Sequence, residues 1–167
     1  MIDKVQGIAA KISNQRHLLA LRDSMAGVMP LIIIGSFFML IANFPLESFT
    51  NWLADIGLQT FFNKASDSTF GIIGLAVTYA LAHNLAKTYG VDSLSAGLLS
   101  LGGYVLLTPL LESEGGMGFP TKYLGTSGLF VGIIVAIIST EIFRWFVEKD
   151  ITIKMPSTVP PNVSRAF

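Results

Sequence analysis

The chain has 167 residues, of which 51% are hydrophobic and only 13% charged, a composition that predicts an integral membrane protein and not an ordinary soluble domain. Its 11 basic and 11 acidic residues cancel, so the charge balance gives no support for a nucleic-acid partner. It has no cysteine, which excludes disulfides, thiolate metal sites and cysteine nucleophiles, and its two histidines cannot form a metal site alone.

The first segment, residues 1–22, has the pattern of an amphipathic helix. Its apolar residues recur at spacings of three and four, at Ile2, Val5, Ile8, Ala9, Ile12 and Leu19. We therefore expect an interfacial helix on the cytoplasmic face of a membrane, with a solvated helix packed on another domain as the alternative. Because the segment is polar and leads into no cleavage site, we expect no signal peptide, and the first apolar run should remain as an anchor.

Four stretches of 18 to 23 residues without a charged side chain follow. Each is long enough for a transmembrane helix, and a soluble protein of this size would have too little polar surface to cover four of them. The sequence therefore predicts an all-α integral membrane protein with a four-span bundle over residues 23–148. The expected spans are 24–44, 69–86, 94–111 and 125–146.

The connections between these spans also carry signals. Residues 46–64 repeat apolar and aromatic side chains around Trp52, which predicts a second interfacial helix with an aromatic anchor. The loop over residues 112–126 is rich in glycine and is expected to be a flexible connection. Residues 149–167 are broken by prolines and are expected to form a cytoplasmic connector that stops before the next helix.

The fourth span has two internal patterns. Small side chains recur every four residues, at Gly128, Gly132, Ala136 and Thr140, which predicts close packing against another helix. At its end, Glu141, Arg144 and Glu148 are spaced by three and four residues, which predicts a local ladder of ion pairs at the membrane edge.

The basic residues predict the orientation. Nine of the 11 lie in segments on one side of the four spans, whereas only Lys64 and Lys122 lie on the other. By the positive-inside rule, both termini should be cytoplasmic. The nine are Lys4, Lys11, Arg16, Arg22, Lys87, Arg144, Lys149, Lys154 and Arg165.

The chain shows no pattern that predicts catalysis. The charge-free stretches contain no ionisable group except His83, for which a hydrogen bond to backbone or lipid headgroups is favoured over a substrate contact. The glycines near residue 115 lack the lysine and the strand-to-helix context of a phosphate loop. We therefore predict no catalytic, substrate-binding or metal-binding residue and no cofactor in this chain.

The two ends of the chain resemble one family. The first stretch is Asn14 to Leu18 followed by Leu21 to Ser36, and the second contains Lys154, Met155, Pro156, Val159, Pro160, Pro161, Val163, Ser164 and Arg165. Both are similar to the membrane (IIC) components of the bacterial sugar phosphotransferase system, in particular the lactose, cellobiose and chitobiose family. The second stretch resembles the loop between that family's fourth and fifth spans.

The resemblance implies a bacterial inner-membrane permease that is homodimeric and has about ten spans. Its N-terminal half would build the dimer interface, and its C-terminal half would hold the sugar site. A IIB partner, charged through IIA, would phosphorylate the incoming sugar on a cysteine that belongs to IIB, which agrees with a chain lacking cysteine. Because the chain stops at Phe167, ahead of the expected sugar-binding half, we carry over no substrate-binding residue.

The leading hypothesis is therefore the N-terminal scaffold and dimerisation part of a permease for a β-linked disaccharide such as cellobiose. Whether the chain acts within an enzyme system depends on the IIB partner, since no catalytic residue is predicted here. The alternative is a small four-span membrane scaffold or assembly protein without a sugar substrate. A small multidrug exporter is disfavoured, because the first span lacks the acidic residue that such exporters need.

Overall fold

The structure is a computed structural model that describes residues 14–113 and 116–151. Most of the expected helix over 1–22 and of the connector over 149–167 lies outside the described residues. The elements, in chain order, are α2 (Arg16–Ala42), α3 (Glu47–Asp55), α4 (Leu58–Phe70), α5 (Ile73–Tyr89), α6 (Ser93–Leu107), β1 (Leu111–Ser113), β2 (Gly116–Gly118), α7 (Thr121–Leu124), the 3-10 turn η1 (Thr126–Gly128) and α8 (Leu129–Glu148).

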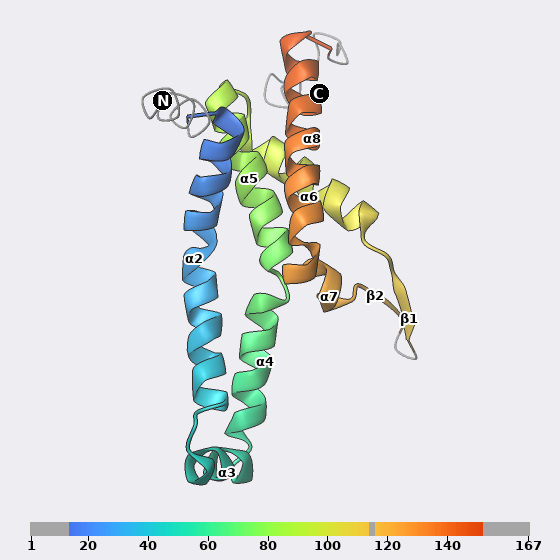
Figure 1. Cartoon of the computed structure of the whole chain (residues 1–167). Coiled ribbons are helices and arrows are strands. Elements are labelled where there is room, and N and C mark those ends of the chain that lie inside the picture. Colours follow the sequence, from blue (N-terminus) through green and yellow to red (C-terminus); the bar gives the residue numbers. More distant parts are fainter. Residues whose placement is uncertain (1–13, 114–115, 152–167) are drawn as a thin grey trace, which may run out of the picture.

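Long antiparallel helices form the body of the molecule. Helix α2 runs along most of its height, α3 lies across the far end, and α4 and α5 return beside α2 (Figure 1). Helices α6 and α8 then pack against α5, and α8 runs in the same direction as α5. The start of α2 and the end of α8 consequently lie at the same end of the bundle, which is the arrangement that the expected orientation requires.

The described residues contain three helical segments that are long and apolar enough to cross a membrane: Arg16–Ala42, Leu58–Tyr89 and Thr126–Glu148. The remaining expected span, 94–111, is helical only over Ser93–Leu107. Fifteen residues extend about 22 Å, less than the roughly 30 Å of a bilayer core. The helix stops here because Pro109 disfavours helical geometry in the residue before it, and Thr108 is extended, with ψ of 123°.

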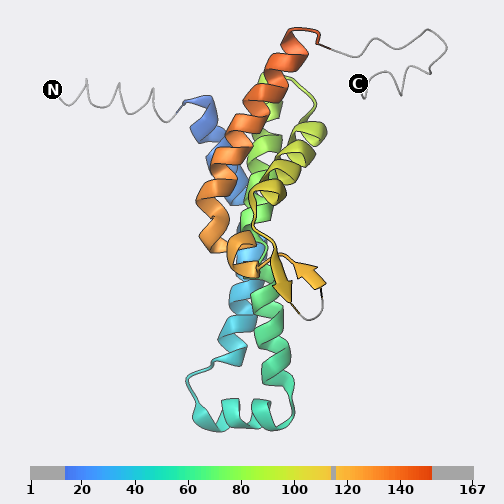
Figure 2. The ribbon, with the colours of Figure 1, turned by 90° about the vertical axis from the view of Figure 1, so that its right-hand side faces the viewer.

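A small β-hairpin occupies part of the loop expected over residues 112–126. Strands β1 and β2 are antiparallel, with Glu112 opposite Met117. Gly116 has φ of 111°, a conformation that strongly favours glycine. The hairpin projects from the bundle in both views (Figures 1 and 2). The all-α prediction is therefore wrong for residues 111–113 and 116–118.

The segment Leu58–Tyr89 changes the expected second span. Helices α4 and α5 follow one another with only Gly71 and Ile72 between them, and the Gly71 N–H donates to the Asp67 carbonyl at 2.7 Å. The candidate membrane segment therefore begins ten residues before the charge-free stretch that starts at Ser68 and includes Lys64 and Asp67. Lys64 and Asp67 lie outside the charge-free stretch in which His83 was singled out, so this longer segment contains ionisable groups that the stretch does not.

The expected interfacial helix over 46–64 is divided between two elements. Helix α3 lies across the end of the long helices (Figure 2), with Leu53 buried and Trp52 54% exposed. Gly57 has φ of 75° and allows the sharp turn into α4. The remainder of the range, from Leu58, belongs to the rising helix.

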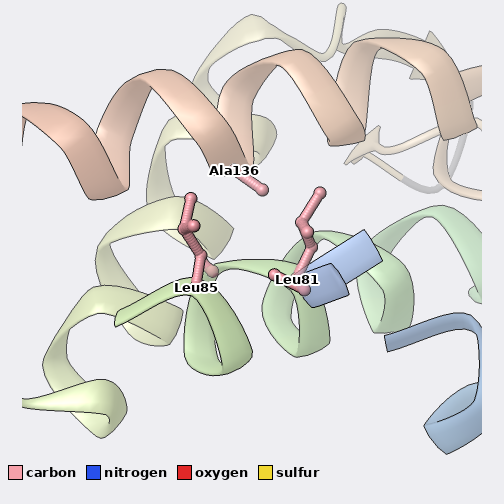
Figure 3. Packing of buried hydrophobic residues seen from close by; sticks show 5 residues of the cluster. Leu81, Leu85 and Ala136 are labelled. Atoms are coloured by element: carbon pink, nitrogen blue, oxygen red, sulfur yellow. The ribbon is translucent and has the colours of Figure 1, made fainter. Parts of the chain in front are cut away.

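The core lies where α2, α5 and α8 meet. Leu81 and Leu85 of α5 lie beneath Ala136 of α8, and Ala20 of α2 completes the contact (Figure 3). All four side chains are at most 1% exposed. The two alanines allow close approach of the helix backbones, while the leucines fill the space between them.

Candidate functional site

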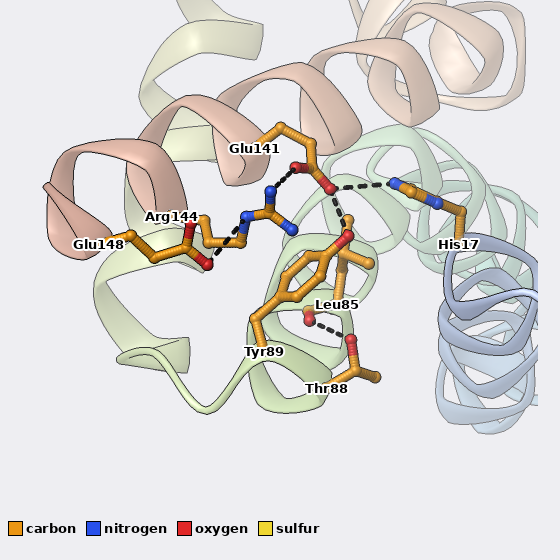
Figure 4. A network of polar contacts seen from close by, with 7 residues as sticks. All are labelled: His17, Leu85, Thr88, Tyr89, Glu141, Arg144 and Glu148. Carbon is orange, nitrogen blue, oxygen red and sulfur yellow. Dashed lines mark hydrogen bonds and ion pairs between the residues drawn. The ribbon is translucent and has the colours of Figure 1, made fainter.

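The most connected polar cluster lies at the cytoplasmic end predicted for the bundle and is centred on Glu141 of α8. Nε2 of His17, from α2, lies 3.1 Å from Glu141 Oε1, and the Tyr89 hydroxyl, from α5, donates to the same oxygen (Figure 4). The side chains of His17 and Glu141 are 31% and 32% exposed. One carboxylate therefore joins three helices.

Arg144 completes this cluster. Its guanidinium lies 3.5 Å from Glu141 on one side and 3.5 Å from Glu148 on the other. It also lies over the Tyr89 ring, 4.4 Å from the ring centroid, which is a cation–π geometry. The predicted ladder of Glu141, Arg144 and Glu148 is confirmed. Its extension to His17 and Tyr89 was not predicted, because they lie 124 and 52 residues away in the chain.

The contacts of this cluster indicate a structural role, which is to hold α2, α5 and α8 together. Its acidic and basic groups form ion pairs with one another, although the buried Nε of Arg144 has no hydrogen-bond partner among the described residues. The partly buried Glu141 carboxylate has acceptor sites occupied by three neighbours. Among the described residues, no group of three or more His, Cys, Asp or Glu side chains could hold a metal ion.

A second group of contacts lies at the opposite end of α8, where α8 begins next to α6 and α7. The hydroxyl of Tyr104, which is 1% exposed, donates to the Tyr123 carbonyl at 2.6 Å. A Cβ on Gly128 would lie 1.8 Å from that carbonyl oxygen, and one on Gly132 would lie 2.3 Å from Thr78 Oγ1. The small face of α8 is therefore packed against its neighbours as predicted, with Gly128, Gly132, Ala136 and Thr140 all buried.

His83, the ionisable residue that the sequence singled out, is hydrogen-bonded to backbone. Its Nδ1 lies 3.2 Å from the Ser93 carbonyl, and a protonated Nδ1 donates to it. The ring also stacks on Tyr79, with 5.7 Å between centroids. The favoured prediction of a backbone partner is therefore confirmed, and His83 joins α5 to the start of α6.

Comparisons with known proteins also identify the chain as part of a membrane protein. The family model described as "Phosphotransferase system, EIIC" matches residues 22–167. The chain belongs to the phosphotransferase system EIIC family. The resemblance predicted from the two ends of the sequence is thus confirmed, and the chain is a multi-pass protein of the bacterial cell membrane.

Relatives within the EIIC family support the same assignment. The chain is 42% identical to the lichenan permease IIC component of Bacillus subtilis, a match covering 99% of this chain and 39% of that protein. It is 40% identical to the cellobiose-specific EIIC component of Geobacillus stearothermophilus, covering 99% of this chain and 40% of that protein. The chain therefore spans about 40% of the length of these curated relatives.

A solved structure of an EIIC protein has the same fold. The chain superposes on ChbC, the IIC component of the N,N'-diacetylchitobiose-specific phosphotransferase system, with a TM-score of 0.86. The two are 38% identical, and the match covers 98% of this chain and 41% of ChbC. The arrangement of α2 to α8 is therefore that of part of a phosphotransferase permease.

Proposed function

We propose that this chain is the N-terminal scaffold and dimerisation part of a permease of about ten spans that takes up a β-linked disaccharide such as cellobiose. The observation that carries the proposal is the match to EIIC proteins over nearly the whole chain. Uptake would be coupled to phosphorylation by IIA and IIB partners. The small membrane scaffold without a sugar substrate is the alternative, and the family match favours the permease.

The substrate class is supported by the relatives. The names of three of them refer to lichenan, cellobiose and oligo-β-mannoside. Lactose-specific relatives are less similar, at 31% to 33% identity. The ordering of identities favours a β-glucoside over lactose.

The proposed orientation places both termini in the cytoplasm. The start of α2 and the end of α8 lie together, as the contact between His17 and Glu141 requires. Basic Arg16, Arg144 and Lys149 cluster at this end, which suits the cytoplasmic side. The other end, with α3 and the hairpin, then faces outward.

The proposed homodimer is supported by the apolar surface of the bundle. Leu106 of α6 is 84% exposed and Phe130 of α8 is 77% exposed, and many neighbouring side chains on both helices are also apolar. Such surfaces require lipid or another protein helix. A cysteine scan of these two helices, followed by crosslinking in membranes, tests for the dimer without background because the chain has no cysteine.

A chimeric permease tests the function. The matching segment of the Geobacillus cellobiose-specific component is replaced by this chain and expressed with the cognate IIA and IIB proteins in a strain unable to take up cellobiose. We expect intracellular accumulation of labelled cellobiose phosphate that depends on IIB. A chimera that reaches the membrane as a folded protein but accumulates no sugar phosphate would contradict the proposal.

A further inference from the structure

A polar cleft lies at a step in the structure. Helix α4 and the adjacent half of α2 continue beyond α7, where the bundle of α5, α6 and α8 ends (Figures 1 and 2). The cleft at this step has a volume of about 540 Å³, within the usual range for small-molecule sites. We call it the vestibule; one wall is α4 and the other is α7 with η1.

The α4 wall is a stripe of polar side chains on one helical face. Thr60, Asn63, Lys64 and Asp67 recur at spacings of three and four, and Gly71 continues the stripe beyond the end of the helix. The opposite wall contributes Thr121, Lys122, Thr126 and Ser127. Hydroxyl, amide, ammonium and carboxylate groups therefore face one small space.

Glycines bring the two walls together at one end of the vestibule. A Cβ on Gly125 would lie 2.7 Å from the Phe70 carbonyl oxygen and 3.2 Å from the Gly71 Cα. A Cβ on Gly71 would lie 3.5 Å from the Thr121 Cβ of the opposite wall. The close approach at Gly71 and Gly125 holds the polar stripe of α4 next to α7. The backbone packing therefore sets the position of both walls of the cleft.

Two of the three charged groups of the vestibule have no partner within the described residues, whereas the Lys122 ammonium lies over the Tyr123 ring, 5.8 Å from its centroid. Within residues 14–113 and 116–151, the Lys64 ammonium and the Asp67 carboxylate have no hydrogen-bond or ion-pair partner. Their helix packs beside the apolar part of α2, where Phe38 stacks on Phe62 at 6.0 Å. Ionisable groups within a candidate membrane segment usually face a water-filled space or a bound polar partner. The vestibule provides such a space.

The hydrogen-bond donors and acceptors that line the vestibule favour a neutral ligand over an anionic one. The Asp67 carboxylate repels a phosphate or carboxylate ligand. A sugar hydroxyl, in contrast, can donate to Asp67 and accept from Lys64 or Lys122. Phe70 adds an apolar surface to the wall. A neutral ligand with many hydroxyl groups satisfies both the donors and the acceptors.

We propose that the vestibule is a binding site for a neutral oligosaccharide on the outer side of the membrane, separate from the site in which the permease phosphorylates its sugar. The assignment of the sugar class and of the outer side rests on the proposed function. The site would collect the sugar before it enters the transport pathway.

Binding to the whole chain in lipid nanodiscs tests the proposal, with cellotetraose as the probe and saturation-transfer NMR as the readout. We expect saturable binding that is about tenfold weaker in Asp67→Ala and in Lys64→Ala, since each removes a charged hydrogen-bonding group. Asp55→Ala is the matched control, because Asp55 is exposed on α3 outside the vestibule. Circular dichroism verifies that each variant is folded.

Three results of the binding experiment would overturn the assignment. These are the absence of saturable binding by the wild-type chain, equal binding by the folded Asp67→Ala and Asp55→Ala variants, or binding of glycerol 1-phosphate in place of cellotetraose, which would indicate a lipid headgroup site. In the chimeric permease, Asp67→Ala should raise KM for cellobiose with kcat little changed. Uptake by a chimera whose KM is insensitive to Asp67 would overturn the vestibule alone, whereas sugar binding without any uptake would contradict the proposed function alone.

Discussion

Tyr89 donates its phenolic hydrogen to Glu141 Oε1, which joins the last turn of α5 to α8 across 52 residues of sequence. The same oxygen contacts His17 of α2, so the helix that begins the bundle is held at the same point. A contact of this kind fixes the relative height of three helices, which apolar packing alone specifies poorly because apolar surfaces slide with little change in energy.

Removing the charge at Glu141 should destabilise the bundle. Glu141→Gln weakens the charge-assisted contacts to His17, Tyr89 and Arg144, and we expect a loss of about 1–2 kcal/mol after allowing for partial exposure. Thermal unfolding of the detergent-solubilised chain measures it. The control Glu148→Gln removes a more exposed partner of the same arginine, 58% exposed, and should cost less than about 0.5 kcal/mol. Equal losses in the two variants would refute a special role for Glu141.

The contact between Gly128 and the loop before it should not tolerate a side chain. In Gly128→Ala, the new Cβ would lie 1.8 Å from the Tyr123 carbonyl oxygen and 2.0 Å from the Tyr104 hydroxyl, so backbone must move. We expect a loss of roughly 1–3 kcal/mol or failure to accumulate in the membrane. Gly102→Ala is the matched control, because nothing lies within 4 Å of its Cβ position in α6, and it should stabilise that helix slightly. Expression level and unfolding temperature distinguish the two variants.

The start of α6 should make stability depend on pH in the acid range. The Ser95 hydroxyl and the backbone N–H groups of Ser95 and Leu94 donate to Asp92 and hold the pKa of its carboxyl below the ordinary value. Because the folded pKa is depressed, this contribution is complete above the unfolded pKa, near 4, and is lost as pH falls through the folded pKa.

Unfolding temperatures from pH 6 down to pH 3 measure the Asp92 contribution. Asp92→Ala should cost about 1 kcal/mol at pH 6, as loss of a helix cap does, and progressively less at lower pH. Asp92→Asn should retain much of the cap while removing this residue's share of the pH dependence. An unchanged pH profile in Asp92→Asn would show that other groups dominate.

Surface labelling should distinguish the two ends of the bundle. Ser48, at the start of α3, and Lys149, after α8, are both exposed and lie at opposite ends. With single cysteines introduced, a membrane-impermeant maleimide added to intact cells should label Ser48→Cys but label Lys149→Cys only after lysis. The reverse pattern would invert the orientation derived from the basic residues.

Much of the fold follows from local features of the sequence. Uninterrupted apolar stretches predict helices wherever water is absent, because backbone groups must then be satisfied within the segment. The small side chains at Gly128, Gly132, Ala136 and Thr140 predicted a packed face, and the structure confirms it. The spacing of Glu141, Arg144 and Glu148 likewise predicted the contacts that α8 makes with itself.

Other features depend on contacts between distant residues and were not predicted. The charge-free stretch of the second span starts at Ser68, but a further helix, α4, packs against α2 and extends the candidate membrane segment back to Leu58, so that it includes Lys64 and Asp67. Pro109 shortened α6, and strand pairing made a hairpin from a glycine-rich loop. Sequence by itself determined which segments are apolar helices and which family they resemble, because both are properties of local order. Only the tertiary structure decided that His17 and Tyr89 meet Glu141 and that the α4 stripe faces α7, because these depend on how the helices are set against one another.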